Sequence, residues 1–167
     1  MTVTTPKPRL QMARLPQQLL GSTTFLLKRL GYAAKERSTA AYEELGLHPY
    51  HHAVLIALGE SSHETQGSIA DALGYDRGQL VGLLDELEKR ALVERRRDPA
   101  DRRRHLVSLT PDGKRMLAGL NTVARRNEDD FLDPLSDKER ETLHALLRKL
   151  AEKHEPRCAP LPPPPAN

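Results

Sequence analysis

Residues 94–105 constrain the fold more than any other part of the chain, because arginines stand on both sides of a short turn signal. The turn, residues 98–101, is typical of a type I turn opened by Asp98 with Pro99 in its second position. Short apolar runs flank the segment at residues 91–93 and 106–109, so the pattern predicts a β-hairpin. A two-stranded hairpin is marginally stable alone and must pack against helices.

Six arginines surround this turn and would stand around the tip of the hairpin. They are Arg95, Arg96, Arg97, Arg102, Arg103 and Arg104. Guanidinium groups held out in solvent suit a phosphate backbone or a narrow minor groove. The alternative is a solvated charge run that binds nothing, and the residues before the hairpin decide between the two.

Composition favours a soluble helical protein. The chain has 167 residues, enough for one domain, with 38% hydrophobic but only 4% aromatic residues and a net charge of +3. Its single cysteine, Cys158, excludes an internal disulfide and a multi-cysteine metal site. No signal peptide or bilayer-length apolar run is present, so we expect a cytoplasmic protein with no membrane partner.

Hydrophobic periodicity and capping residues predict a mainly α fold with six helices and the two-stranded hairpin. The expected helices cover residues 15–45, 49–58, 68–73 (capped by Thr65), 76–90 (capped by Asp76), 111–131 (capped by Thr110) and 136–150. Residues 60–67 look like a loop. Residues 1–14 are expected to be a flexible arm, and residues 155–167 a disordered Pro-rich tail.

The spacing within residues 68–84 is typical of a helix-turn-helix. Ala70 is small where two helices cross, Gly74 suits a left-handed turn, and Leu80 and Leu83 anchor the second helix. An arginine-rich hairpin directly after such a pair predicts a winged helix-turn-helix.

Four segments resemble the MarR family of transcriptional regulators: residues 69–74 (IADALG), 83–93 (LLDELEKRALV), 98–103 (DPADRR) and 109–113 (LTPDG). The resemblance implies a single domain over residues 15–154, with the winged helix-turn-helix at about 48–110. It also implies a homodimer formed by helices 15–45 and 111–154, which binds a pseudo-palindromic operator on double-stranded DNA. A small-molecule inducer, or an oxidant, would relieve repression or less often activation; no cofactor is implied.

The same resemblance assigns DNA contacts. Arg102 and Arg103 would enter the minor groove or grip phosphates at the wing tip, and Asp101 would orient an arginine through a charge-assisted pair. Phosphate contacts are expected from Arg95, Arg96, Arg97 and Arg104, although Arg104 could instead point back to the body. Any one of these arginines could alternatively be solvated without a partner.

The second helix of the motif should lie in the major groove, and its exposed residues are Arg77, Gly78, Gln79, Val81 and Gly82. Arg77 can pair with guanine, Gln79 with adenine, and Val81 can touch a thymine methyl group. Gln79 has a second interpretation, as the reciprocal cap of Asp76. The two glycines would allow close approach to the duplex.

His48, His51 and His52 cluster at the start of the second helix, with the spacing of a metal-ligand pair but no supporting cysteine. The family's inducer cavity makes Tyr32, Tyr42, His51 and His52 candidate ligand-binding residues, and packing is the alternative for each. Cys158 lies in the tail without a motif that would lower its pKa, so redox sensing is not favoured.

No nucleophile motif, catalytic triad or glycine-rich phosphate loop is present, so an enzyme is not expected. The sequence predicts a homodimeric DNA-binding transcriptional regulator, most simply a ligand-relieved repressor. The alternative is a non-catalytic helical interaction protein that uses its basic hairpin for acidic partners.

Overall fold

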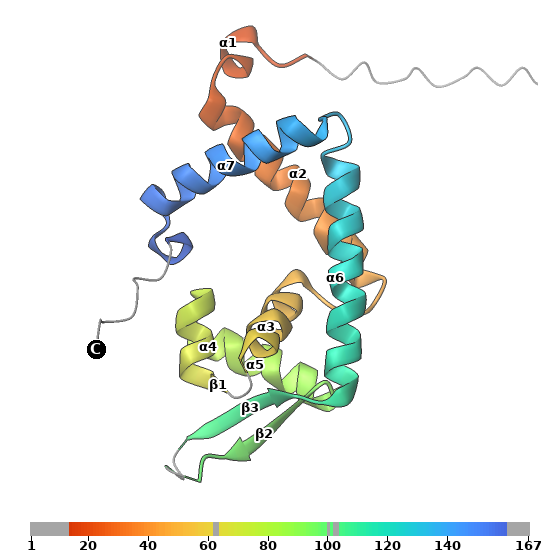
Figure 1. Ribbon diagram of the computed structural model, residues 1–167, viewed down its shortest axis with the longest axis vertical. Coiled ribbons are helices and arrows are strands. Elements are labelled where there is room, and N and C mark those ends of the chain that lie inside the picture. The colour runs from red at the N-terminus through yellow and green to blue at the C-terminus, as the bar shows by residue number, and fades with distance from the viewer. Residues whose placement is uncertain (1–13, 62–63, 100, 102–103, 160–167) are drawn as a thin grey trace, which may run out of the picture. The chain divides into compact units, whose positions relative to one another are not determined.

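The computed structural model describes residues 14–61, 64–99, 101 and 104–159. The chain divides into two compact units, residues 1–36 and 37–167, and the boundary falls within the second helix. The elements in chain order (Figure 1) are α1 (Gln17–Leu20), α2 (Thr23–Glu43), α3 (Pro49–Glu60), β1 (Glu64–Thr65), α4 (Gln66–Leu73), α5 (Arg77–Lys89), β2 (Val93–Arg97), β3 (His105–Leu109), α6 (Pro111–Phe131), α7 (Asp137–His154) and the 3-10 turn η1 (Pro156–Cys158).

The mainly α class is confirmed, but the described ranges hold seven α-helices where six were predicted. The expected helix over residues 15–45 is interrupted at Gly21 and Ser22. Glycine is a poor helix former, and the Ser22 hydroxyl accepts the backbone N–H of Phe25 at 3.3 Å, which starts a new helix.

The sheet has three strands, in the order β1–β3–β2, and both pairings are antiparallel. The predicted hairpin is present, with Val93 opposite Leu109 and Arg97 opposite His105. The prediction of a loop over residues 60–67 was wrong in part, because Glu64 and Thr65 pair with β3. A strand of two residues is too short to show an alternation of polar and apolar residues. β1 is therefore recognised only by its pairing with the free edge of β3.

Side-chain caps begin the helices of the second unit where the sequence predicted them. The Thr65 hydroxyl accepts the N–H of Ser68 at 3.1 Å, and a carboxylate oxygen of Asp76 accepts the N–H of Gly78 at 2.8 Å. The Thr110 hydroxyl accepts the N–H of Gly113 at 3.0 Å. These bonds satisfy N–H groups that have no partner within their own helix.

Three helices end in a left-handed residue, at Gly46 (φ 63°), Gly74 (φ 67°) and Ala91 (φ 55°). After α5, the N–H of Leu92 donates to the carbonyl of Leu87 at 2.9 Å, and the N–H of Ala91 donates to that of Glu88 at 2.9 Å. This pair of bonds defines a Schellman motif, in which glycine normally takes the left-handed position. The end of α5 therefore has an alanine in a conformation that favours glycine.

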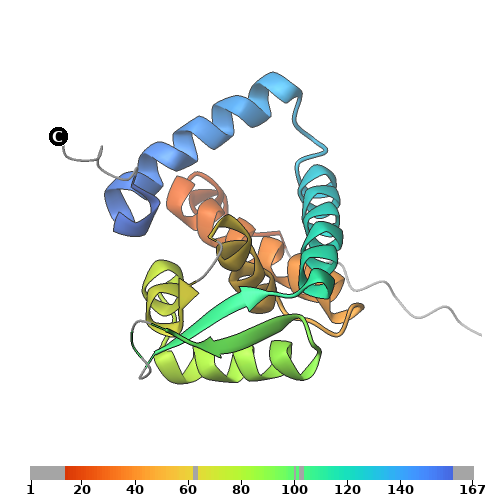
Figure 2. The same cartoon turned by 60° about the horizontal axis from the view of Figure 1, so that its bottom comes forward.

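The core lies in the second unit, among α3, α4, α5, α6 and the sheet. Its buried hydrophobic residues are Tyr42, Leu47, Val54, Leu55, Leu58, Ile69, Ala70, Leu80, Leu84, Leu87, Leu92, Val93, Val107 and Leu120. The start of α6 approaches β2 so closely that a Cβ on Gly113 would lie 1.9 Å from the Leu92 carbonyl oxygen. Figure 2 shows α5 running alongside the β2–β3 hairpin, which this core holds in place.

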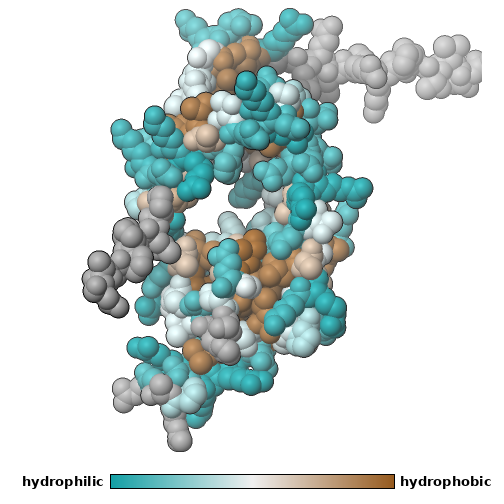
Figure 3. All heavy atoms as spheres, viewed as in Figure 1, coloured by the Kyte–Doolittle hydropathy of each residue, from teal (hydrophilic) through white to brown (hydrophobic). Residues whose placement is uncertain are grey.

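Large apolar side chains remain exposed in both units, and hydrophobic patches are visible in Figure 3. In the first unit they are Leu15, Leu19, Leu20, Leu26, Leu27, Leu30 and Tyr32. On α7 they are Leu146, Leu147 and Leu150. Over the ranges that the structure describes, no helix combines the length and the apolar content needed to cross a bilayer.

Candidate DNA interface

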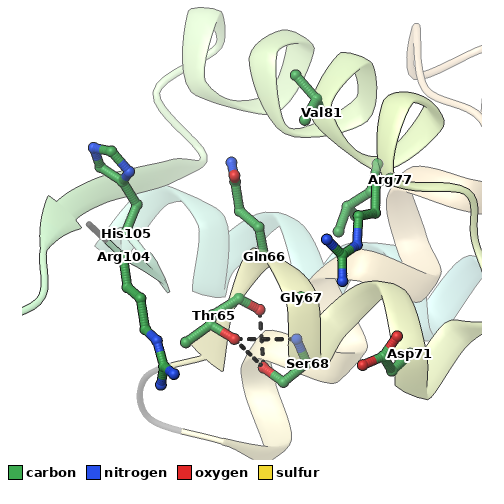
Figure 4. A pocket seen from close by; sticks show the side chains of 10 residues that line it. Thr65, Gln66, Gly67, Ser68, Asp71, Arg77, Val81, Arg104 and His105 are labelled. Atoms are coloured by element: carbon green, nitrogen blue, oxygen red, sulfur yellow. Dashed lines mark hydrogen bonds between the residues drawn. The ribbon is translucent and has the colours of Figure 1, made fainter. Parts of the chain in front are cut away.

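A groove of about 590 Å³ lies where the first turns of α4 and α5 face the beginning of β3 (Figure 4). It is open to solvent and carries both charged and hydroxyl groups. Its lining residues are Thr65, Gln66, Gly67, Ser68, Asp71, Arg77, Leu80, Val81, Arg104 and His105. The groove therefore brings residues from the helix-turn-helix and from the wing to one surface.

The two faces of α5 separate as its sequence predicted. Leu80, Leu84 and Leu87 are buried, while Arg77, Gln79 and Val81 are exposed, Val81 to 42%. This face exposes functional groups suited to base edges because the three leucines hold it outward.

Gln79 does not form the reciprocal cap. Asp76 accepts the backbone N–H of Gln79 at 3.3 Å, but the Gln79 side chain makes no hydrogen bond among the described residues. One turn later, a Cβ added to Gly82 would meet no atom within 4 Å. Both positions are thus sterically free on the solvent side of α5.

The hairpin arginines differ in their surroundings. Arg96 is 74% exposed and pairs with Glu94 at 3.1 Å, whereas exposed Arg97 has no ion pair within the described ranges. Asp101 pairs with Arg104 at 3.3 Å. Arg102 and Arg103, predicted to lie at the wing tip, fall outside the described residues.

Arg95 lies apart from these groups. Its guanidinium faces α5 and contacts Asp85 and Glu88, so it does not join the exposed set that was expected to contact phosphates. Arg104, just before β3, is one of the residues that line the groove (Figure 4).

Sequence reasoning missed four polar groove residues, Gln66, Ser68, Asp71 and His105. Gln66 and Ser68 lie on the first turn of α4, where the helix dipole favours an anion, although the N–H of Ser68 already donates to the Thr65 hydroxyl. The Ser68 hydroxyl donates to the Thr65 carbonyl at 2.8 Å and also contacts Glu64. The Thr65 cap was the sequence signal for Gln66 and Ser68, because it places the start of α4 beside α5.

Two candidate ligand-binding residues, both buried, belong to a hydrogen-bonded chain in the second unit. The Tyr42 hydroxyl lies 2.7 Å from His52 Nδ1, and His52 Nε2 lies 2.8 Å from Asn121 Oδ1. Because the amide oxygen only accepts, Nε2 carries the proton and Nδ1 accepts from Tyr42. Burial raises the pKa of Tyr42, so the hydroxyl stays a donor.

His51 is also buried, at the start of α3. Its Nδ1 accepts the backbone N–H of His48 at 3.0 Å, and its Nε2 lies 2.9 Å from a carboxylate oxygen of Glu86 on α5. Burial lowers the pKa of His51, and the facing carboxylate of Glu86 only partly offsets this effect. One turn beyond Glu86, Arg90 donates to the carbonyl oxygens of Gly46 at 2.7 Å and Leu45 at 3.1 Å.

The remaining candidate, Tyr32, is exposed in the first unit and lines a hollow of about 270 Å³ with Arg29, Ala33 and Glu36. As for the metal-pair interpretation of the histidines, no group of three or more His, Cys, Asp or Glu side chains able to hold an ion occurs among the residues that the structure describes.

Known proteins resemble this chain in sequence and in fold. Residues 45–104 match the model of the MarR family. Transcriptional regulator HosA of Escherichia coli O111:H- is 33% identical over 99 residues, which cover 59% of this chain and 73% of HosA. HTH-type transcriptional repressor NicR of Pseudomonas putida is 29% identical over 126 residues, covering 73% and 80%.

Solved structures of the repressor CouR are similar throughout their length. CouR bound to a 23-mer DNA duplex superimposes with a TM-score of 0.75 at 32% identity, covering 83% of this chain and 99% of that one. CouR from Rhodococcus jostii RHA1 bound to p-coumaroyl-CoA gives a TM-score of 0.68 at 27% identity, covering 81% and 96%.

Proposed function

The chain belongs to the MarR family of transcriptional regulators, which bind DNA without catalysing a reaction, and we propose that it is a homodimeric repressor released from its operator by a small ligand. It would act in the cytoplasm. The observation that carries the proposal is the shared groove, in which Arg77 and Val81 of α5 face the same space as Arg104 and His105 of the wing.

The reading residues are Arg77, Gln79 and Val81. The side chains of Arg77 and Gln79 have no ion pair or hydrogen bond among the described residues, so neither must give up a partner to contact DNA. Arginine recognises guanine and glutamine recognises adenine in the major groove, while valine suits a thymine methyl group. Because only Arg77 and Gln79 in this set can form bidentate hydrogen bonds to a base, each protomer would distinguish few bases.

The wing supplies sequence-independent affinity. Arg96, Arg97 and Arg104 are exposed toward solvent and suit phosphates, and Arg102 and Arg103 are proposed for the minor groove or its phosphates. Gln66 would add a further phosphate contact at the start of α4.

Homodimerisation is supported by exposed apolar side chains on α7. Leu146, Leu147 and Leu150 follow helical spacing on α7 and are all more than a third exposed. An exposed stripe of this kind marks an interface, and a second copy of the chain is the partner proposed here.

The ligand proposal rests on the family and on CouR, which has been solved with p-coumaroyl-CoA. Tyr42, His51, His52 and Tyr32 remain the candidate contacts. Because Tyr42 and His52 already hydrogen-bond each other, a ligand that contacted them would have to exchange that bond. Such an exchange would change the contacts between α2 and α3. This region is connected to α5 by the hydrogen bond from Arg90 to the Gly46 carbonyl and by the pair of His51 with Glu86.

DNA binding is tested by footprinting the inverted repeats beside the gene, followed by competition with random DNA at physiological salt. We expect protection of one pseudo-palindrome, and loss of affinity with a smaller salt dependence when Arg102 and Arg103 are both changed to Ala. If random DNA competes as well as the palindrome, the alternative of a basic interaction protein is favoured.

Assembly is tested by light scattering on the purified chain. We expect the mass of a dimer for the unmodified protein, and a shift toward monomer for Leu146→Glu, because that side chain is 58% exposed in the single chain. Lys149→Glu, a charge change on the same helix, is the control. A monomeric unmodified protein would contradict the proposed homodimer.

A further inference from the structure

Arg95 points toward α5, the proposed recognition helix, rather than toward solvent. Its Nη1 lies 2.6 Å from Asp85 Oδ1 and 2.8 Å from Glu88 Oε2, and its Nη2 lies 3.5 Å from the Val81 carbonyl oxygen. The side chain is only 17% exposed. One basic group on β2 thus contacts two acidic side chains that lie one turn apart on α5.

Strand alternation explains why this arginine differs from its neighbours. Residues two apart share a face of a strand, so Arg95 shares the face of Val93, which is buried in the core. Arg96 has the opposite orientation and is exposed, and Arg97, the last residue of β2, is also exposed. The three consecutive arginines therefore have different surroundings.

Removing Arg95 from this position would be unfavourable. Its guanidinium is largely withdrawn from water, and the contacts to the two carboxylates compensate for the lost hydration. If the side chain turned to a DNA phosphate, Asp85 and Glu88 would be left as two unneutralised negative charges on the helix that enters the groove.

We propose that Arg95 is a positioning residue that fastens the wing to the recognition helix and does not itself contact DNA. This inference rests on the proposed DNA-binding function. A sequence-specific site requires α5 and the wing to reach adjacent grooves at a set separation, whereas non-specific binding to phosphates does not. Arg95 therefore contributes to discrimination between operator and random DNA.

The first experiment compares Arg95→Gln with Arg97→Gln in the full-length protein. For Arg95→Gln we expect operator affinity to fall roughly tenfold, the loss typical of one misaligned base contact, with much less change for random DNA. The slope of log K against log salt should stay unchanged. A lost phosphate contact would instead weaken both DNAs alike and reduce that slope by about one per protomer, which is the result expected for Arg97→Gln.

The second experiment removes the partners, by the double change Asp85→Asn and Glu88→Gln. Two negative charges fewer per chain should strengthen DNA binding if only electrostatic attraction mattered. Loosening the wing should instead weaken operator binding, and we expect that weaker binding. Tighter operator binding by this variant, or an Arg95→Gln variant with a reduced salt slope, would overturn the proposal.

A readout without DNA keeps the inference separate from the proposed function. Amide hydrogen exchange of residues 93–97 and 105–109 in the free protein should be faster in Arg95→Gln than in Arg97→Gln, because Arg95 contacts two carboxylates of α5 and Arg97 has no ion pair among the described residues. Equal exchange in the two variants refutes the fastening itself. If exchange differs but the unmodified protein shows no sequence preference, the proposed function fails and the contact stands.

Discussion

Replacing Ala91 by glycine should stabilise the protein. Ala91 takes φ 55° immediately after α5, and the Schellman bonds of Ala91 and Leu92 hold it there. The turn cannot relax to a right-handed conformation, because Leu92 and Leu87 are both buried in the core on either side of it. An L-residue in this region is strained by its own Cβ, and glycine is not.

The expected gain follows from two opposing terms. Left-handed geometry costs an ordinary L-residue about 1–2 kcal/mol. Glycine loses more conformational freedom on folding than alanine, and this entropy cost offsets about 0.4–1 kcal/mol of the relieved strain. Ala91→Gly should therefore raise the free energy of unfolding by about 0.5–1 kcal/mol per chain, which corresponds to a rise in Tm of roughly 2 °C for a protein of this size.

Urea unfolding at one fixed protein concentration measures the effect, with a higher midpoint and an unchanged m-value as the expected result. Gly46→Ala is the matched opposite: Gly46 has φ 63°, and a Cβ there would meet only Arg90 Nη1 at an ordinary 3.7 Å. That variant should lose about 1 kcal/mol for its backbone conformation alone. A destabilised Ala91→Gly protein would refute the reasoning, because the strain at Ala91 would then be absent.

Two further predictions concern α5 and His51. Gly82→Ala should raise the free energy of unfolding by about 0.8–1 kcal/mol, since its Cβ meets open space, yet weaken operator binding by adding a methyl group to the reading face. Gly119→Ala on α6, equally open, should gain similar stability and leave operator affinity unchanged; equal affinities in the two variants would contradict close approach at Gly82. Burial lowers the pKa of His51 in the folded state, so the folded protein favours the neutral imidazole. The neutral imidazole should therefore contribute its full share of stability above the unfolded pKa of about 6.5. This contribution is lost as the pH falls through the lowered folded pKa. Urea unfolding at pH 7.5 and 5.5 should show this loss, and His51→Gln should reduce it; an unchanged pH dependence in that variant would remove His51 as its source.

Capping chemistry made much of the fold predictable. Thr65, Asp76 and Thr110 act locally, through hydrogen bonds to N–H groups two or three residues ahead, so their roles could be identified from neighbouring residues alone. β1 could not be identified this way, since its two residues are strand only because the distant residues Leu106 and Val107 offer a free edge.

The candidate site was partly predictable for a related reason. Leu80, Leu84 and Leu87 mark the inner face of α5, which leaves Arg77, Gln79 and Val81 outside. The run of three arginines in β2 does not by itself show that Arg95 differs from its exposed neighbours, because all three carry the same charge. The burial of Val93 two residues earlier was the signal that Arg95 faces α5.

The sequence by itself determined the mainly helical class, the helix-turn-helix and the hairpin, because periodicity, caps and turn residues act over a few positions. The tertiary structure decided which hairpin arginine faces the helix, and that Ala91 adopts a left-handed turn. Both outcomes depend on distant partners: Asp85 and Glu88 hold Arg95, and the buried pair Leu87 and Leu92 holds the turn. Local pattern thus identifies the elements of this DNA-binding protein, and packing between those elements sets which of their charges remain available to DNA.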